Sequence, residues 1–444
     1  MSTPTTNRGS VRSGLRWAAS HGVMRAVMHR RARGGNPDAE LLVDPVRQDD
    51  PYADYERLRT PAPFTAGAFA RVSVHHDVCH DVLRSDDFGV ADRNGAMPTP
   101  VRLALRLAGP PPHPGPVDPP SMLAVDAPDH TRYRRLVSRA FTARAVAALR
   151  ERTEAIAAEL LDALPARGGT VDLVERYASL LPVTVISEML GAPPEMHEQI
   201  LSWGDGAASS LDMGLERSRF HRVEGDVAAL HGWMTDHLRR LRRDPGDDLL
   251  SRMAGVADDD GRGLSEPELV STALLVLAAG FETTVNLIGN GAALLFAHPD
   301  QRGRLVEDPT LWPNAVDEIL RVESPVQRTA RRARRDTTVR GTDVAAGSLV
   351  VTLLAAANRD PRVFTEPHRF DVGRANAREH LAFSGGVHFC LGAALARMEG
   401  EVALRALFDR FPDLAPAGAP HRRPTRILRG YDAMPVALGT STTV

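Results

Sequence analysis

Cys390 is one of only two cysteines in a chain of 444 residues, and glycines flank it on both sides. In the segment 383–392, FSGGVHFCLG, Gly385, Gly386 and Gly392 leave room for a large flat ligand to approach the backbone closely. A helical pattern begins directly afterwards, and the free N–H groups of a first helical turn favour a thiolate over a thiol. This combination suits a sulfur ligand to a metal.

Three other interpretations of Cys390 stay open at this point: a buried inert cysteine, a cysteine nucleophile and a phosphate-binding glycine loop. The segment lacks the Lys and Ser/Thr that a P-loop needs, which argues against the last. A nucleophile needs a base and an orienting partner, which sequence alone does not place. Cys79 lies in a helical pattern without glycines and is predicted to be a packing residue. Two cysteines so far apart cannot build a disulfide framework, which is typical of a reducing cytosol.

The segment FSGGVHFCLG resembles the haem-binding loop of cytochromes P450, with Phe383, Gly386, Cys390 and Gly392 at the family's positions. The resemblance implies the cytochrome P450 fold and haem b (iron protoporphyrin IX) as the cofactor. It also implies that Cys390 is the metal ligand, a proximal thiolate that pushes electron density toward O–O cleavage.

A second segment, AAGFETTVN, lies inside a long apolar helical pattern that opens with a capping box of Ser265 and Glu268. Burying an acid and two threonines in an apolar helix costs free energy, so such residues usually have hydrogen-bond partners or a functional role. The hydroxyl of Thr283 can bond the carbonyl of Ala279 and open the helix locally; the alternative is a polar stripe that faces other polar groups. By resemblance to the family's AGxET segment, Thr283 is implied to hydrogen-bond dioxygen and Glu282 to relay protons from solvent.

Several basic side chains resemble the family's ligands to the haem propionates. In DAPDHTRYRRLV, His130 and Arg134 are spaced at i and i+4, so they share one face of a helix. The family's positions also include Arg331 and, two residues before the cysteine, His388. Each alone would be an ordinary surface cation. Four further arginines lie within 328–335, so a register error would move the role of Arg331 to a neighbour.

The helical pattern LWPNAVDEILRVESP places Glu318 and Arg321 at i and i+3. Taken alone, such a pair is usually an ordinary surface ion pair. In the P450 family the corresponding pair joins an arginine behind the haem, and FTEPHRFDVGR supplies Arg369 for that position. The prediction is a Glu318–Arg321–Arg369 triad that supports the cysteine loop.

Helical periodicity dominates the whole chain, with few strand patterns, which predicts a mainly α fold with a minor β part. No repeat or long linker divides it, so a single domain over 41–444 is expected, after an extension over 1–40 that is partly disordered or helical. The extension holds no acid before residue 38, and an organellar transit peptide is its alternative. A net charge of −2 gives no sign of nucleic-acid binding. No membrane span is expected, because Glu282 interrupts the longest apolar stretch, and the predicted location is the cytoplasm.

The resemblance implies a haem-thiolate monooxygenase that inserts one atom of dioxygen into a small molecule. Electrons must arrive from a ferredoxin or flavodoxin with an NAD(P)H-dependent reductase, because no dinucleotide fingerprint accompanies the haem motifs. Arg132, Arg135 and Arg139 are candidate docking residues, or else an ordinary solvated helix face. The family's pocket walls are mainly aliphatic here, which favours a lipophilic substrate; they fall at 97–123, 195–241, 276–287, 326–329 and 431–434.

Three other function classes are alternatives to the monooxygenase. A haem sensor or carrier would not need GFETT, and a haem-thiolate peroxygenase or isomerase often lacks the Glu282–Thr283 pair. A cysteine hydrolase would bind no haem.

Overall fold

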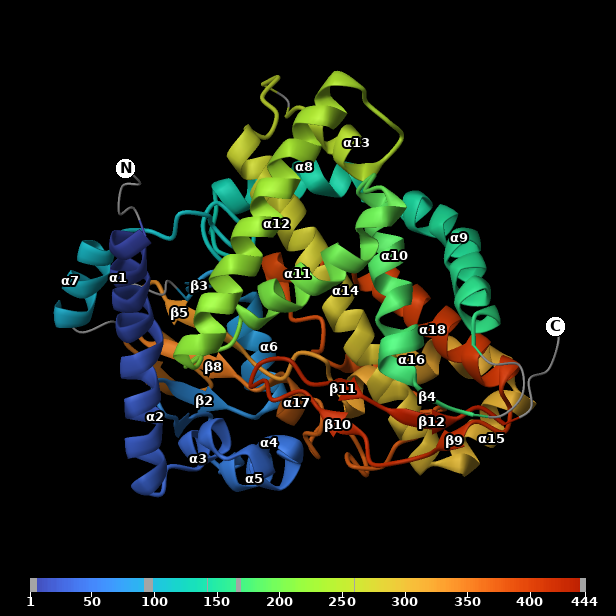
Figure 1. Ribbon diagram of the computed structural model, residues 1–444. Helices are drawn as coiled ribbons and strands as arrows, with labels where there is room; N and C mark the ends of the chain where they lie inside the picture. The colour runs from blue at the N-terminus through green and yellow to red at the C-terminus, as the bar shows by residue number, and fades with distance from the viewer. Residues whose placement is uncertain (1–5, 92–98, 142, 165–168, 259, 440–444) are drawn as a thin grey trace.

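The computed structural model describes residues 6–91, 99–141, 143–164, 169–258 and 260–439 (Figure 1). Its α-helices are α1 (Thr6–Trp17), α2 (Val23–Arg33), α3 (Pro37–Val43), α4 (Pro45–Asp49), α5 (Tyr52–Leu58), α6 (His76–Arg84), α7 (Thr99–Ala108), α8 (Asp129–Ala140), α9 (Ala143–Asp162), α10 (Leu180–Met189), α11 (His197–Ser209), α12 (Arg217–Arg243), α13 (Leu249–Gly255), α14 (Glu266–Ala297), α15 (Pro299–Glu307), α16 (Trp312–Val322), α17 (Leu354–Ala357) and α18 (Ala393–Arg410). Short π and 3-10 turns join several of them. The predicted mainly α fold is confirmed.

The strands form small sheets at the periphery of the helical body (Figure 1). The largest sheet has the order β1 (Thr65–Ala66), β2 (Arg71–Ser73), β8 (Leu349–Thr352), β5 (Thr329–Ala333) and β3 (Phe88–Val90). A second sheet has the order β4 (Thr170–Asp172), β12 (Pro435–Ala437) and β9 (Ala415–Pro416), and two-stranded pairs join β10 (His421–Arg422) to β11 (Tyr431–Ala433) and β6 (Thr337–Val339) to β7 (Thr342–Val344). In the β6–β7 hairpin, Arg340 and Gly341 both have positive φ, the geometry of a tight two-residue turn.

Helix α14 passes through the middle of the molecule (Figure 1) and packs against α10, α11, α12, α16 and α18. It spans 32 residues, and the predicted capping box is confirmed, with the side chain of Glu268 accepting the N–H of Ser265 at 2.8 Å. Among the described residues it is the one helix long and apolar enough to cross a bilayer, but 72% of its most apolar window is buried. Because its apolar face meets other helices all round, α14 is a core helix, which positions its central residues at the heart of the fold.

The N-terminal extension was predicted to be partly disordered or helical. The structure shows helix from Thr6 to Arg33, interrupted by a π turn at Ala18–Gly22. This segment lies against α12 and α7, and Met28 is fully buried against α3. The proline-rich stretch 109–120 after α7 forms no helix or strand.

Candidate functional site

The cysteine loop is a tight connection between the end of the β-rich region and α18. The backbone N–H of Cys390 donates to the carbonyl of Phe383 at 3.0 Å, which closes the loop on itself. The ring of Phe383 is buried and packs beneath the guanidinium of Arg397, 4.6 Å from the ring centroid. Phe389 is 42% exposed although it stands within this closely packed loop. The loop therefore holds Cys390 in a fixed place, partly buried against the main hydrophobic core.

Gly386 is required for this geometry. Its φ is +66°, and a Cβ atom there would lie 2.3 Å from the carbonyl oxygen of Leu83 in α6. No side chain can be accommodated against a backbone atom at that distance, so the loop can approach α6 only with glycine. At Gly392, by contrast, an added Cβ atom would meet nothing within 4 Å among the described atoms, so this glycine leaves open space beside the sulfur.

Cys390 itself is half-buried and lies at the start of α18. Burial raises the pKa of its thiol, while the N–H of Gly392, Arg134 and Arg397 act in the opposite direction. The three opposing groups are the donors and positive charges that a thiolate requires. Cys79 differs: it is fully buried in α6, burial raises the pKa of its thiol to about 12, and its predicted packing role is confirmed.

Two histidines and two arginines gather beside the cysteine loop. The rings of His130 (α8) and His388 lie 4.1 Å apart, and the Nε2 atom of each is buried with no hydrogen-bond partner among the described residues. Arg331 (β5) is also buried, and within the described part of the chain its guanidinium donates only to neutral oxygens: the carbonyl of Ala330 at 2.9 Å and two hydroxyls. The fourth residue of the group is Arg134 of α8, and burial lowers the pKa of its guanidinium.

Among the described residues, this cluster has no carboxylate of its own to balance its buried cations. The nearest carboxylate, Asp126, lies 3.9 Å from Nε2 of His388 and is already paired with Arg334 at 2.7 Å. Burial, followed by His130 and Arg331, lowers the pKa of His388 to about 3. Two added carboxylates would satisfy the orphaned donors, and haem carries two propionates, so the residues present fit the cofactor.

The centre of α14 carries the two threonines singled out in the sequence. The Oγ1 atom of Thr283 donates to the carbonyl of Ala279 at 2.8 Å, which confirms the predicted hydrogen bond, and Thr284 does the same to Gly280 at 3.0 Å. Ala279 is exposed although the helix around it is buried. A side chain that is exposed in the middle of a core helix marks the wall of an internal space.

Glu282 is almost fully buried, with 2% of its surface exposed, and it reaches a cation that no sequence pattern had placed there. Its Oε1 lies 2.8 Å from the guanidinium of Arg423, which also contacts Asp205 of α11 at 2.5 Å and Asp432 of β11 at 3.3 Å. Burial raises the pKa of Glu282 to about 7; Arg423 lowers it, and Asp205 and Asp432 raise it. Its second oxygen, Oε2, has no partner among the described residues. Such a carboxyl can gain and lose a proton near neutral pH.

A second buried carboxyl, Glu399 of α18, was not predicted from the sequence. Its exposed fraction is 2%, and burial raises its pKa to about 8, with the hydroxyl of Thr284 as the one group that lowers it. The only signal in the sequence is an acid at a position whose neighbours, Met398 and Val402, follow the core-facing spacing of the helix.

The predicted support triad is corrected in one member. Glu318 and Arg321 form a fully buried bidentate pair, with Nε–Oε2 at 2.7 Å and Nη2–Oε1 at 2.8 Å, rather than a surface bridge. The third member is Arg374, whose Nε lies 3.0 Å from Oε1 of Glu318. The side chain of Arg369 is 56% exposed and pairs with Glu366.

The chain path explains the error over Arg369. Its backbone carbonyl accepts from Arg321 and from Arg374, both at 2.9 Å, so this residue contributes its main chain to the cluster and turns its side chain outward. Arg374 then enters from the far end of the same loop, and also donates to the carbonyl of Thr365 at 2.7 Å. The buried guanidinium groups are thus directed at carboxylate and carbonyl oxygens, which lets the charges stay buried.

All three candidate docking arginines have partners within the protein. Arg132 pairs with Glu268 at the start of α14, and Arg139 donates to the carbonyl of Ala257. Arg135 also has a partner. The start of the predicted pocket wall at 97–123 falls on Met97 and Pro98, which lie outside the described residues.

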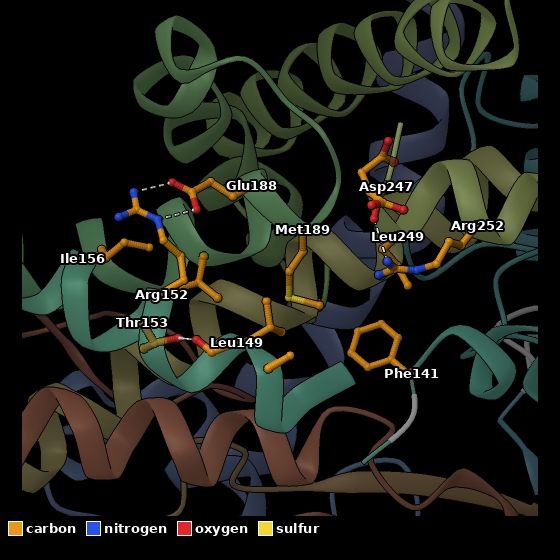
Figure 2. A pocket seen from close by; sticks show the side chains of 13 residues that line it. Phe141, Leu149, Arg152, Thr153, Ile156, Glu188, Met189, Asp247, Leu249 and Arg252 are labelled. Carbon is orange, nitrogen blue, oxygen red and sulfur yellow. Dashed lines mark hydrogen bonds and ion pairs between the residues drawn. The ribbon is translucent and has the colours of Figure 1, made fainter. Parts of the chain in front are cut away.

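One cavity of about 310 Å³ lies elsewhere, between α9, α10 and α13 (Figure 2). Its apolar floor includes Leu149, Ile156 and Met189, and its rim carries Arg152, which is held bidentately by Glu188. None of its described lining residues belongs to the cysteine loop or to the centre of α14, so it is separate from the candidate haem site.

Comparisons with known proteins agree with this geometry. The family described as "Cytochrome P450" matches residues 233–428. The chain is 49% identical over 428 residues to "Putative cytochrome P450 140" of Mycobacterium tuberculosis, a match that covers 96% of this chain and 97% of that one. It is 46% identical over 317 residues to "6-deoxyerythronolide B hydroxylase" of Saccharopolyspora erythraea, covering 70% and 76%. Among solved structures, that of Mycobacterium smegmatis CYP164A2 in its ligand-free state superposes with a TM-score of 0.79 at 36% identity, covering 89% and 98%.

Proposed function

The chain belongs to the cytochrome P450 family and is a haem-thiolate monooxygenase, and we propose that Cys390 is the thiolate that holds its haem b. The family, the cofactor and the reaction type were all predicted from the sequence, and each is confirmed. When bound, the haem supplies the activation of dioxygen, which consumes two electrons and two protons and leaves one oxygen atom as water. The remaining work falls to the side chains of this chain.

We assign the cofactor cradle to the residues around the cysteine loop. Phe383 and Gly392 shape the loop at the sulfur, and Ala279 forms the wall on the opposite side. His130, Arg134, Arg331 and His388 would hold the two propionates. The support is their shared position and the unpaired Nε2 atoms of the two histidines among the described residues.

Thr283 and Glu282 are the proposed proton-handling pair. The Thr283 hydroxyl donates its hydrogen bond to the carbonyl of Ala279, so its oxygen can still accept a hydrogen bond inside the pocket. Glu282 exchanges protons near neutral pH, and its partner Arg423 links it to Asp205 and Asp432, whose side chains are 56% and 41% exposed. Together these groups would carry protons from solvent to the centre of α14.

We further propose a lipophilic small-molecule substrate and electron delivery by a ferredoxin or flavodoxin with an NAD(P)H-dependent reductase, in the cytoplasm. The related hydroxylase named for 6-deoxyerythronolide B supports the substrate class. The aliphatic side chains of α14, among them Val276 and Val285, are also consistent with it. We propose that 41–444 is one domain and 1–40 its extension.

The observation that carries the cofactor assignment is the loop that fixes Cys390 through the bond from its N–H to Phe383. The test is the carbon monoxide spectrum of the reduced protein. The wild-type protein should show the Soret position of a thiolate ligand, and Cys390→Ser should lose it. Cys79→Ser is the matched control and should keep the wild-type spectrum. A thiolate-type spectrum that survives in Cys390→Ser would refute the assignment.

A further inference from the structure

Exposed apolar side chains gather at one edge of the molecule, on the N-terminal helices and α7. Eleven large hydrophobic side chains are exposed among the described residues, and five of them lie on these elements: Val11, Leu15, Val23, Leu103 and Leu107, with exposed fractions from 41% to 68%. Helices α1 and α7 pack against each other (Figure 1). The exposed side chains therefore lie on neighbouring elements. Patches of this kind mark interaction sites more often than chance exposure does.

The spacing of the exposed residues defines a continuous stripe on each element. Along α1 and α2, Val11, Leu15, Ala18, Val23 and Ala26 are all exposed, at intervals that follow one side of the helix across its π turn. The opposite side is anchored: Trp17 donates to the carbonyl of Leu215 at 2.9 Å, and Arg16 pairs with Glu224 at 2.8 Å. The stripe is therefore left over after the helix has made its internal contacts, and it is not a frayed end.

Helix α7 repeats this pattern with leucine and arginine side by side. Arg102, Leu103, Arg106 and Leu107 are exposed at i, i+1, i+4 and i+5, which is one face of the helix, whereas Ala108 is buried. A helix that alternates leucine and arginine on its solvent side has no need of the leucines for its own core.

The charge of this edge has a single sign. Residues 1–37 contain seven arginines and no acid, and α7 adds two arginines and no acid. Arg16 and Arg25 are paired within the protein, with Glu224 and Glu216. Among the described residues, no ion pair is formed by Arg12, Arg30, Arg31, Arg102 or Arg106, which makes the edge a source of uncompensated positive charge. The whole chain has a net charge of −2, so the arginines are concentrated here against the overall balance.

We propose that this edge, formed by the outer faces of α1, α2 and α7, docks reversibly on the surface of an anionic lipid bilayer. Leucine and valine side chains would enter the boundary between headgroups and acyl chains, and the arginines would lie among lipid phosphates. A bilayer satisfies both properties of the edge at once, whereas a small acidic protein would need the charge but not a long apolar stripe. No membrane span is involved, because the helices keep their inner faces on the protein.

Docking of this kind would bring a lipid surface close to the proline-rich loop that follows α7 and to α12. Helix α7 leads directly into the proline-rich loop, in which the rings of His113 and His231 of α12 lie 5.1 Å apart. Gly115 of the same loop approaches Val227 of α12. A lipophilic molecule dissolved in the bilayer would then meet the enzyme at the loop and helices predicted to wall its pocket. This consequence depends on the proposed function, but the docking itself does not.

The test is co-sedimentation of the full-length, haem-loaded protein with phosphatidylglycerol vesicles and with phosphatidylcholine vesicles. Wild-type protein should bind the anionic vesicles at least tenfold more tightly, and raising the salt concentration should weaken binding. Arg102→Gln/Arg106→Gln should weaken it by about fivefold for each arginine removed. Leu103→Gln/Leu107→Gln should weaken it by at least tenfold.

Matched controls remove the same chemistry far from this edge. Val46→Gln/Val306→Gln changes two valines that are 80% and 73% exposed, and Arg239→Gln/Arg405→Gln removes two exposed arginines. Both should bind vesicles like the wild type. Absence of binding by the wild-type protein, equal losses in the controls, or binding that survives the leucine substitutions would overturn the proposal. A dimer that forms without lipid and is lost in the α7 variants would also overturn it, by assigning the edge to a second copy of the chain.

Discussion

Replacing the buried acid of α14 by its neutral isostere, Glu282→Gln, should change how the stability of the enzyme depends on pH. Burial raises the pKa of this carboxyl from 4.5 to about 7. The folded protein therefore holds a proton that the unfolded chain has released, in the window between these two values. A group with a raised folded-state pKa stabilises the fold at low pH and loses that contribution as pH rises through about 7.

The size of the effect follows from the shift. The pKa shift of Glu282 changes the free energy of unfolding by about 3 kcal/mol in total. Roughly 2.5 kcal/mol of this change falls between pH 5 and pH 8. Glutamine matches the protonated carboxyl, so the variant and the wild-type enzyme should be equally stable at pH 5. At pH 8 the variant should be more stable, because it carries no buried negative charge. For a chain of this length the difference corresponds to about 2–3 °C in Tm.

The ion pair with Arg423 does not reverse this sign. Removing one partner of a buried pair usually strands the other charge. Here Arg423 keeps Asp205 at 2.5 Å and Asp432 at 3.3 Å, so it stays compensated in Glu282→Gln. The converse substitution, Arg423→Gln, leaves Glu282 without its cation and should raise its pKa further, which makes the enzyme less stable than the wild type at pH 8.

The assay is thermal unfolding of the haem-loaded proteins in a pH series, with the wild-type curve subtracted so that other titrating groups cancel. The difference between Glu282→Gln and wild type should grow from near zero at pH 5 to its full value at pH 8. Two parallel curves would show that the carboxyl has an ordinary pKa in the folded enzyme. A variant that is less stable at pH 8 than the wild type would show that the Arg423 pair outweighs burial.

Further substitutions test three of the assigned roles. Arg374→Gln should cost about 3–5 kcal/mol of stability and lower the haem content, because it breaks a buried charge cluster, whereas Arg369→Gln should change stability by less than about 0.5 kcal/mol in the same denaturation assay. Thr283→Ala should keep substrate binding but raise hydrogen peroxide relative to product, and unchanged coupling would contradict its proposed role. Arg331→Gln should speed the loss of haem to an acceptor protein several-fold, and a larger effect of Arg332→Gln would move the propionate role to that neighbour.

The parts of the site that could be predicted from the sequence are those whose partners are close along the chain. The bond from Thr283 to Ala279 spans one helical turn, and the capping box of Ser265 and Glu268 spans three residues, so helix geometry alone fixes both. The loop around Cys390 is local too: the glycines that singled it out lie within 383–392, and the bond that closes it joins residues seven positions apart.

Contacts between distant parts of the chain could not be predicted in this way. Arg369 and Arg374 are both arginines in one loop, and the choice between them depends on how that loop turns around Glu318. No periodic pattern encodes such a turn. Arg423 and Asp205 are far from Glu282 in the chain and meet it only because α11 and the C-terminal hairpins close over α14. Residues of this kind are placed by tertiary packing, which a local pattern does not contain.

The two buried carboxyls at the centre of the molecule illustrate what that packing achieves. Glu282 and Glu399 lie beside successive threonines of α14 and are equally buried, and burial raises the pKa of both, to about 7 and about 8. They differ in their connections. Glu282 is joined through Arg423 to side chains that reach solvent, whereas a hydroxyl is the one group that favours ionisation of Glu399. Only Glu282 therefore has a charged path toward solvent, and this difference supports the proposed role of Glu282 and Thr283 in proton delivery.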